Sequence, residues 1–244
     1  MLELIKLSIE AHGGFDRWNQ LRQISAALAP GGIGLKQRGQ EAFTRMSTRV
    51  TVDTRQQKAI FAPFLAPGQC GIFEPYRTAV ETVDGTILEE LKDPRDSFKR
   101  MPAGTPWSAT QLAYFVGYAM SMYLTVPFSL LRDGIEHQEV APWLEEGEAW
   151  HALKVTFPKS YVTHSAEQTI YFDGKGLIRR HDYTAEVSGD VEVAHYLYDH
   201  QTFDGIVFPT RRRAYLRSPD RTPQKDPAII SADLSDFKLS RAVP

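Results

Sequence analysis

The fold is decided by residues 168–216, QTIYFDGKGLIRRHDYTAEVSGDVEVAHYLYDHQTFDGIVFPTRRRAYL. Apolar and polar side chains alternate along four segments of this stretch, as they do in strands with one buried face. Each gap between segments carries glycine, which favours tight turns between antiparallel strands. With the preceding segment 150–157, the stretch predicts an antiparallel meander of five strands.

The turns set the register of this meander. We expect a two-residue turn at 174–175, a three-residue loop at 188–190 and a two-residue turn at 204–205. These turns predict the cross-strand pairs Gln168–His181, Tyr183–His195, Arg179–Asp199 and Leu197–Arg212. An even-numbered loop around Gly189 would instead set Ala185 against Glu192. Because side chains alternate with period two, that shift would expose a whole apolar face, so we expect an odd number of loop residues.

One face of the predicted meander is apolar and carries a polar patch in its middle. The patch comprises Gln168, Arg179, His181, Tyr183, His195, Asp199 and Arg212. A polar side chain buried in the core costs free energy unless it is hydrogen-bonded, paired with a charge or part of a functional site. The opposite face, which includes Arg180 and Asp182, has the pattern of a solvated surface. The sequence therefore predicts a cavity with a polar floor.

An apolar helix is the second strong signal. Residues 108–111, SATQ, match a capping box and open a helix that runs to about Leu124. The segment is apolar nearly all round but short and polar for a membrane span, so we expect it to lie buried across the sheet. Tyr114, Tyr118 and Met122 on this helix could line a ligand tunnel, or could simply pack in the core.

The rest of the chain completes the expected architecture. Two short helices are predicted within residues 2–24, strands between 24 and 91, and a last strand at 229–239. The glycine-rich run 31–34 is interpreted as a turn that opens no helix, and His12, His137 and His164 as solvated. The predicted class is α+β and mostly β, with a large curved antiparallel sheet, an open half-barrel, wrapped around the apolar helix. Residues 1–244 are predicted to form a single domain.

Composition limits the function classes. Among 244 residues the net charge is −2, which gives no argument for binding nucleic acid or an anionic membrane. The single Cys70 excludes an internal disulfide, and no glycine loop, nucleophile elbow or metal motif indicates a cofactor. Near Met1 there is no long apolar run or small-residue cleavage site, so the expected location is the cytoplasm. The oligomeric state stays open.

Two segments carry a resemblance to a known group. Residues 9–18, IEAHGGFDRW, and 203–211, FDGIVFPTR, resemble parts of proteins with the lipoprotein-localisation carrier fold, the LolA/LolB type. Residues 112–128 and 163–215 resemble an uncharacterised bacterial family of similar length. The resemblance implies a curved antiparallel sheet that encloses helices, a shape that holds acyl chains in the carriers.

Three functions fit these observations. The leading hypothesis is a carrier or sensor of a hydrophobic or amphipathic small molecule, with Arg212 and Arg179 near its anionic end. The second is an isomerase, cyclase or hydrolase that uses His181, His195 and Tyr183 as acid and base. A metal held by His181, His195 and Asp199 is disfavoured by the nearby arginines. The third hypothesis is a scaffold whose concave sheet holds a partner helix.

Overall fold

A computed structural model describes residues 2–99, 101–102 and 104–241. The α-helices are α1 (Glu3–Ala11), α2 (Phe15–Gln20), α3 (Ile33–Gln37), α4 (Glu41–Thr44) and α5 (Ala109–Tyr123). Three short 3-10 helices are η1 (Pro94–Phe98), η2 (Phe128–Leu131) and η3 (Glu186–Ser188). The strands of the first half are β1 (Leu21–Gly31), β2 (Thr48–Asp53), β3 (Ala59–Ala62), β4 (Gln69–Glu74), β5 (Arg77–Thr82) and β6 (Ile87–Lys92). Those of the second half are β7 (Glu136–Glu145), β8 (Glu148–Thr156), β9 (Glu167–Phe172), β10 (Ile178–Ala185), β11 (Val191–Phe203), β12 (Ile206–Arg217), β13 (Pro223–Gln224) and β14 (Ile230–Arg241).

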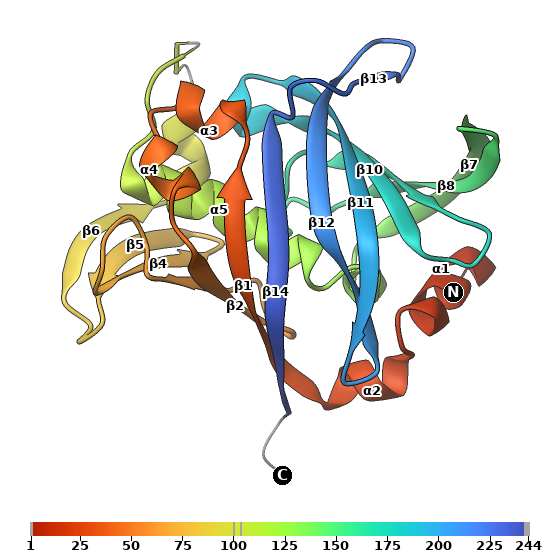
Figure 1. The fold of residues 1–244 in the computed structure, drawn as a ribbon, viewed down its shortest axis with the longest axis horizontal. Coiled ribbons are helices and arrows are strands. Elements are labelled where there is room, and N and C mark those ends of the chain that lie inside the picture. Colours follow the sequence, from red (N-terminus) through yellow and green to blue (C-terminus); the bar gives the residue numbers. More distant parts are fainter. Residues whose placement is uncertain (1, 100, 103, 242–244) are drawn as a thin grey trace.

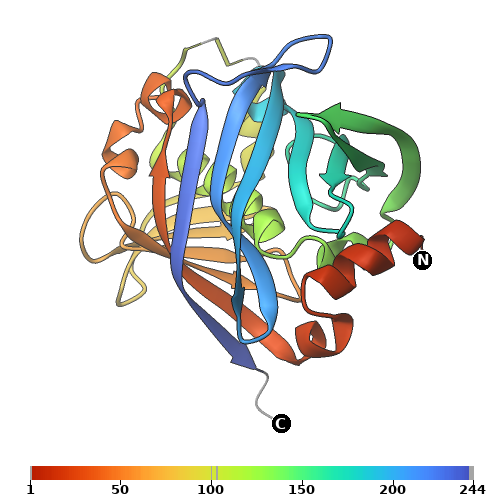
Figure 2. The ribbon, with the colours of Figure 1, turned by 45° about the vertical axis from the view of Figure 1, so that its right-hand side comes forward.

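All strands of the described residues belong to one antiparallel sheet of 14 strands. Its order is β6-β5-β4-β3-β2-β1-β14-β12-β11-β10-β9-β8-β7, with β13 attached to β12. The sheet curls, and α5 crosses its hollow side (Figures 1 and 2). The expected open sheet around an apolar helix is confirmed. We call the side facing α5 the inner face and the opposite side the outer face.

The helix α5 begins where the sequence indicates. The Ser108 Oγ accepts a hydrogen bond from the Gln111 amide at 3.1 Å, and the Gln111 Oε1 accepts one from the Ser108 amide at 2.9 Å. Every residue from Thr110 to Tyr123 is buried, because the curved sheet covers the helix on several sides. None of the helices in the described part of the chain is long and apolar enough to cross a membrane.

The register of the meander agrees with two of the three expected turns in parity, but not in every pair. The turn at 204–205 is confirmed, since Phe203 pairs with Ile206 and Leu197 with Arg212. The loop around Gly189 is odd-numbered as expected, but it spans five residues, 186–190, and not three. A shift of two residues keeps each side chain on its face and changes its partner. Across the Gly189 loop the pairs become His181–His195 and Tyr183–Val193. The two-residue turn expected at 174–175 is wrong: Phe172 pairs with Ile178, and beyond an irregularity between Ile178 and Arg180 Gln168 pairs with Tyr183 and not with His181.

The glycine-rich run after β1 was expected to open no helix, and this interpretation is wrong. Gly32, at a φ of 99°, is the N-cap residue of α3. A side chain on Gly32 would collide with the Ile229 carbonyl oxygen, which a Cβ would approach to 2.4 Å. The glycines therefore let α3 pack directly on the start of β14. Because these two segments are far apart in sequence, a local sequence pattern cannot predict their contact.

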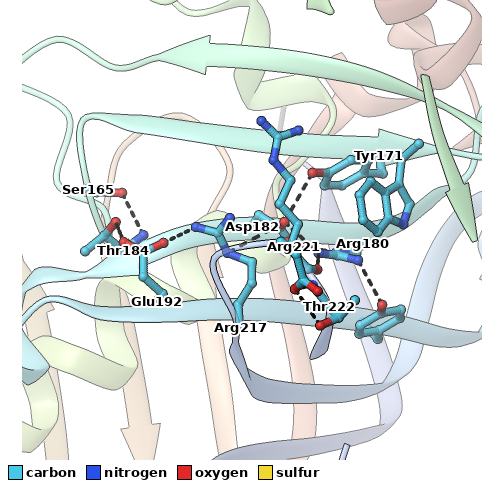
Figure 3. Close-up of polar contacts among 12 residues, drawn as sticks. Ser165, Tyr171, Arg180, Asp182, Thr184, Glu192, Arg217, Arg221 and Thr222 are labelled. Carbon is cyan, nitrogen blue, oxygen red and sulfur yellow. Dashed lines mark hydrogen bonds and ion pairs between the residues drawn. The ribbon is translucent and has the colours of Figure 1, made fainter. Parts of the chain in front are cut away.

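The outer face was expected to be solvated, and part of it is buried instead. The Arg180 side chain is 0% exposed and that of Asp182 is 4% exposed. Arg180 donates from Nε to Asp182 Oδ1 at 2.6 Å and from Nη2 to Asp182 Oδ2 at 2.8 Å. It also donates from Nη2 to the Arg221 carbonyl oxygen at 2.6 Å (Figure 3). Alternation correctly separated the two faces, but it could not show that a distant segment covers the outer one.

Candidate functional site

Five of the seven residues in the expected polar patch meet on the inner face. Gln168, His181, Tyr183, His195 and Arg212 are all at most 5% exposed. His181 donates from Nε2 to Gln168 Oε1 at 2.5 Å, and the ring centroids of His181 and His195 are 6.4 Å apart. The five side chains come from β9, β10, β11 and β12, which are neighbours in the sheet.

Arg179 and Asp199 do not join this cluster, contrary to the sequence-based pairing. A register irregularity between Ile178 and Arg180 takes Arg179 out of the alternation, and Arg179 donates instead to Asp173 Oδ2 at 2.8 Å. Asp199 has a φ of 55° and accepts from Arg211 Nε at 2.6 Å at an exposed position. Such irregularities reverse side-chain direction, and alternation alone does not predict them. The alternative metal site of His181, His195 and Asp199 therefore lacks its carboxylate ligand. In the described ranges no group of three metal-binding side chains is found.

Two residues that sequence reasoning left outside the site are central to it. His164, which was expected to be solvated, is 1% exposed, and its ring stacks on that of Tyr183 at 3.7 Å between centroids. The hydroxyl of Tyr123 lies 2.9 Å from His164 Nε2 and 3.0 Å from the Tyr183 hydroxyl. Tyr123 is the last residue of α5. Because the sequence of this helix predicts packing in the core, it gave no reason to place Tyr123 in the site. For His164, which precedes β9 in a loop, the sequence offered no signal. His12 was also expected to be solvated and is buried, at 1% exposed.

Arg212 is a buried cation. Its Nη2 donates to the Tyr123 carbonyl oxygen at 2.7 Å, and its guanidinium lies 4.7 Å from the Tyr123 ring centroid. Within the described residues its Nε has no hydrogen-bond partner. Burial lowers the pKa of Arg212 to about 10, so the side chain is still protonated at neutral pH.

The imidazoles and phenols around Arg212 are neutral at pH 7. Burial, with the charge of Arg212 second, lowers the pKa of His181 to about 3. Burial also lowers the pKa of His164 and of His195 well below the ordinary value, and it raises the pKa of Tyr123 to about 12 and that of Tyr183 well above its usual range. The cluster is thus one positive charge set among neutral rings.

The three expected residues of α5 lie deep in the core beside this cluster. Tyr114 accepts from Arg95 Nη1 at 3.4 Å, and the Met122 sulfur accepts from the Thr163 hydroxyl at 3.2 Å. Tyr118 is fully buried, and its ring meets that of His164 edge-on at 4.9 Å. These contacts agree with a packing role, and whether any of the three contacts a ligand stays a prediction.

A pocket of about 160 Å³ lies between α3, the C-terminal ends of β10 and β12, and the N-terminal ends of β11 and β14. Its lining is mainly apolar: Ile33, Leu35, Trp107, Phe115, Ala185, Val191, Val193, Ala214, Leu216, Ile229 and Ile230. His164 and Tyr183 form part of its wall, and Arg38 alone is charged among the described residues that line it. Neither His181, His195 nor Arg212 is part of that lining. A smaller cavity of about 40 Å³ shares Leu35, Phe115, Tyr183 and Ile230 and extends along α5.

Comparison with solved structures defines the fold class. The chain has a LolA-like fold. A LolA superfamily protein from Nitrosomonas europaea shares 13% identity at a TM-score of 0.53, covering 99% of this chain and 94% of that one. A domain from Vibrio parahaemolyticus assigned to outer membrane lipoprotein sorting shares 8% at 0.55, covering 99% and 93%. A DUF1329 family protein from Desulfovibrio piger shares 10% at 0.52, covering 99% and 94%.

Sequence comparison adds no closer relative, since no protein-family model and no curated protein matches the chain. The structural neighbours do correct one expectation. The cytoplasmic location inferred from the first residues is contradicted, because the similar structures include a LolA superfamily protein and a domain assigned to outer membrane lipoprotein sorting.

Proposed function

We propose that this protein binds the apolar part of a small amphipathic molecule in the pocket beneath α3, as a carrier or sensor. The observation that carries the proposal is the pocket itself, whose walls are aliphatic and aromatic over most of their extent. Ligand sites of this kind combine apolar walls with a few polar groups that fix orientation. The Vibrio domain of the same fold is assigned to lipoprotein sorting, which supports a lipid-like ligand here.

The buried polar cluster favours binding over acid–base catalysis. A general base works best when its pKa lies near the working pH. Burial moves the pKa of His181 to about 3 and that of His195 well below the usual range, so both are weak bases at pH 7. Neither residue lines the pocket. His164 and Tyr183 do line it, and as neutral groups they suit a hydrogen bond to an uncharged polar atom of the ligand.

The concave sheet is also a poor place for a partner helix. α5 already fills the hollow side of the sheet, and its residues from Thr110 to Tyr123 are buried there. A scaffold that accepted another helix at this position would have to release α5 and expose this apolar surface to water.

The proposal is tested by filling the pocket. Ala214 is 2% exposed and lines it, so Ala214→Phe places a ring where the ligand would lie. We expect the variant to bind the neutral fluorescent probe N-phenyl-1-naphthylamine at least about tenfold more weakly, a change of about 1.4 kcal/mol. Ala149→Phe is the matched control, because Ala149 is exposed on β8 and is not part of the pocket lining.

Circular dichroism and thermal unfolding establish that both variants are folded. Ala185→Phe, which fills the same pocket from β10, replaces Ala214→Phe if that variant unfolds. Native mass spectrometry of wild-type protein should also reveal a co-purified amphiphile. Equal probe binding by wild-type protein and by the two pocket variants would exclude this pocket as the binding site.

A further inference from the structure

Arg38 lines the pocket, is partly exposed to solvent and is held in place by three contacts. It follows α3 as the C-cap residue, and its carbonyl oxygen accepts from the Trp107 amide at 2.9 Å. Its Nη2 donates to the Ser188 carbonyl oxygen at 2.7 Å. The guanidinium lies 5.4 Å from the Trp107 ring centroid. These contacts fix the cation beside an apolar wall while leaving most of its N–H donors for another partner.

The charge of Arg38 is not balanced by a neighbouring acid. In the described part of the chain no carboxylate forms an ion pair with it, although the exposed Asp190 lies two residues from Ser188 in the facing hairpin. Three other acids nearby in sequence or in that hairpin pair with other cations. Glu41 pairs with Arg45 at 2.9 Å, and Glu186 and Glu192 pair with Arg95 and Arg217. A half-buried guanidinium without a counter-ion attracts an anion more strongly than one in bulk water.

We propose that Arg38 binds the anionic head of the ligand, so that a single-chain amphiphile lies with its tail in the pocket and its carboxylate or phosphate at Arg38. The inference rests on the proposed function and adds the ligand's charge and direction. A guanidinium fork matches the oxygens of both head groups. The buried part of the lining, which includes neutral His164 and Tyr183 at 1% and 5% exposed among apolar residues, is suited to the uncharged end of the molecule.

The opposite direction, with the head group inside, is less compatible with the geometry. The other candidate cation, Arg212, donates to the Tyr123 carbonyl oxygen and packs on the Tyr123 ring. It is 2% exposed and does not line the pocket. An anion could reach it only after Tyr123 moved, whereas Arg38 already forms part of the pocket wall.

The experiment compares two ligands of equal chain length, decanoate and decanol, as competitors of N-phenyl-1-naphthylamine at pH 8. For wild-type protein we expect decanoate to compete better at low salt than at high salt. Arg38→Ala should weaken decanoate roughly tenfold or more, the size expected for a charge-assisted hydrogen bond, and change decanol by less than about twofold. Lys36→Ala is the matched control, because this substitution also removes one positive charge at the end of α3. Lys36 itself is exposed and lies outside the pocket lining.

The outcomes separate this inference from the proposed function. A loss of decanoate affinity confined to Arg38→Ala, with decanol unchanged, supports an anion site at Arg38. An equal loss in Lys36→Ala would assign the effect to net charge and overturn the inference, as would an unchanged preference for decanoate in Arg38→Ala. In both of those cases binding of decanol by wild-type protein would leave the proposed function intact. If folded wild-type protein binds neither the probe nor either competitor, the proposed function fails together with the inference.

Discussion

At the scale of single residues, the site is governed by burial. Desolvation penalises the charged form of every titratable group in the inner cluster. It keeps His164, His181 and His195 uncharged and leaves Arg212, whose intrinsic pKa is far higher, as a cation. The same residue types that suggest acid–base chemistry in a sequence therefore form a neutral hydrogen-bonding surface in the folded protein.

This burial predicts loss of stability in mild acid. The pKa of His181 is lowered from 6.5 to about 3, so below pH 6.5 the unfolded chain binds a proton that the folded protein does not. The stabilising contribution is complete above pH 6.5 and is lost as the pH falls toward 3. At pH 5 the loss from this residue is about 2 kcal/mol. Urea unfolding of wild-type protein and of His181→Gln, at pH 7 and at pH 5, measures it.

His181→Gln should lose less stability than wild-type protein between the two pH values, because glutamine does not titrate. His164 and His195 shift in the same direction and remain in the variant, so some acid sensitivity should persist. Identical pH dependence in the two proteins would show that His181 is protonated in the folded state at pH 5, against its buried geometry.

At the scale of elements, the buried ion pair of the outer face joins three parts of the sheet. Arg180 on β10 contacts Asp182 on the same strand, Glu145 at the end of β7 at 3.3 Å, and the carbonyl oxygen of Arg221 before β13. The guanidinium also lies 5.0 Å from the Trp143 ring centroid. The end of β7 is thereby held over the outer face, where Trp150 and Tyr196 belong to a second apolar cluster.

Removing this cation should destabilise the protein strongly. Arg180→Ala removes both guanidinium hydrogen bonds from the buried Asp182 carboxylate, which keeps the Tyr171 hydroxyl at 3.1 Å and Arg217 at 3.8 Å. Breaking a buried ion pair in this way typically costs about 3–5 kcal/mol. Chemical unfolding measures the loss, and hydrogen exchange should increase along residues 136–145. The control is Arg213→Ala, since the Arg213–Asp233 pair on the same face is 22% and 53% exposed and should contribute about 1 kcal/mol or less. Similar losses in the two variants would contradict a special role for Arg180.

At the scale of the whole molecule, the position of α5 inside the curved sheet determines the remaining space. Gly117 lies where α5 approaches β4, and a Cβ at this position would come to 2.1 Å from Phe73 Cβ. The helix therefore sits closer to the sheet than a side chain would allow. The pocket beneath α3 is part of what this close packing leaves open.

Gly117→Ala should destabilise the protein although alanine is the better helix former by about 1 kcal/mol. The added methyl group forces α5 away from β4, and overpacking of this kind costs about 1–3 kcal/mol. Gly174→Ala is the matched control, because no atom lies within 4 Å of the corresponding Cβ. Thermal unfolding of both variants gives the comparison, and a Gly117→Ala protein at least as stable as wild type would mean that the helix can shift freely.

The sequence by itself determined the two faces of the meander, the capped helix α5 and the architecture of an open sheet around it. These features are local: alternation, turn glycines and a capping box act over a few residues, and the turn at 204–205 set Leu197 opposite Arg212 without help from the rest of the fold. The same local rules placed His181, Tyr183 and His195 on the inner face. They were sufficient because each depends on backbone geometry near its own position.

The tertiary structure alone decided which groups meet and which surfaces are covered. Arg179 left the inner cluster through a bulge, and His164 entered it from a loop that stacks on Tyr183. Arg180 became buried because segments more than thirty residues away in sequence, at Glu145 and Arg221, close over it. Arg38 reached the pocket because the glycines before α3 allow that helix to lie on β14. Contacts between distant segments depend on the packing of the whole chain, which no local pattern contains.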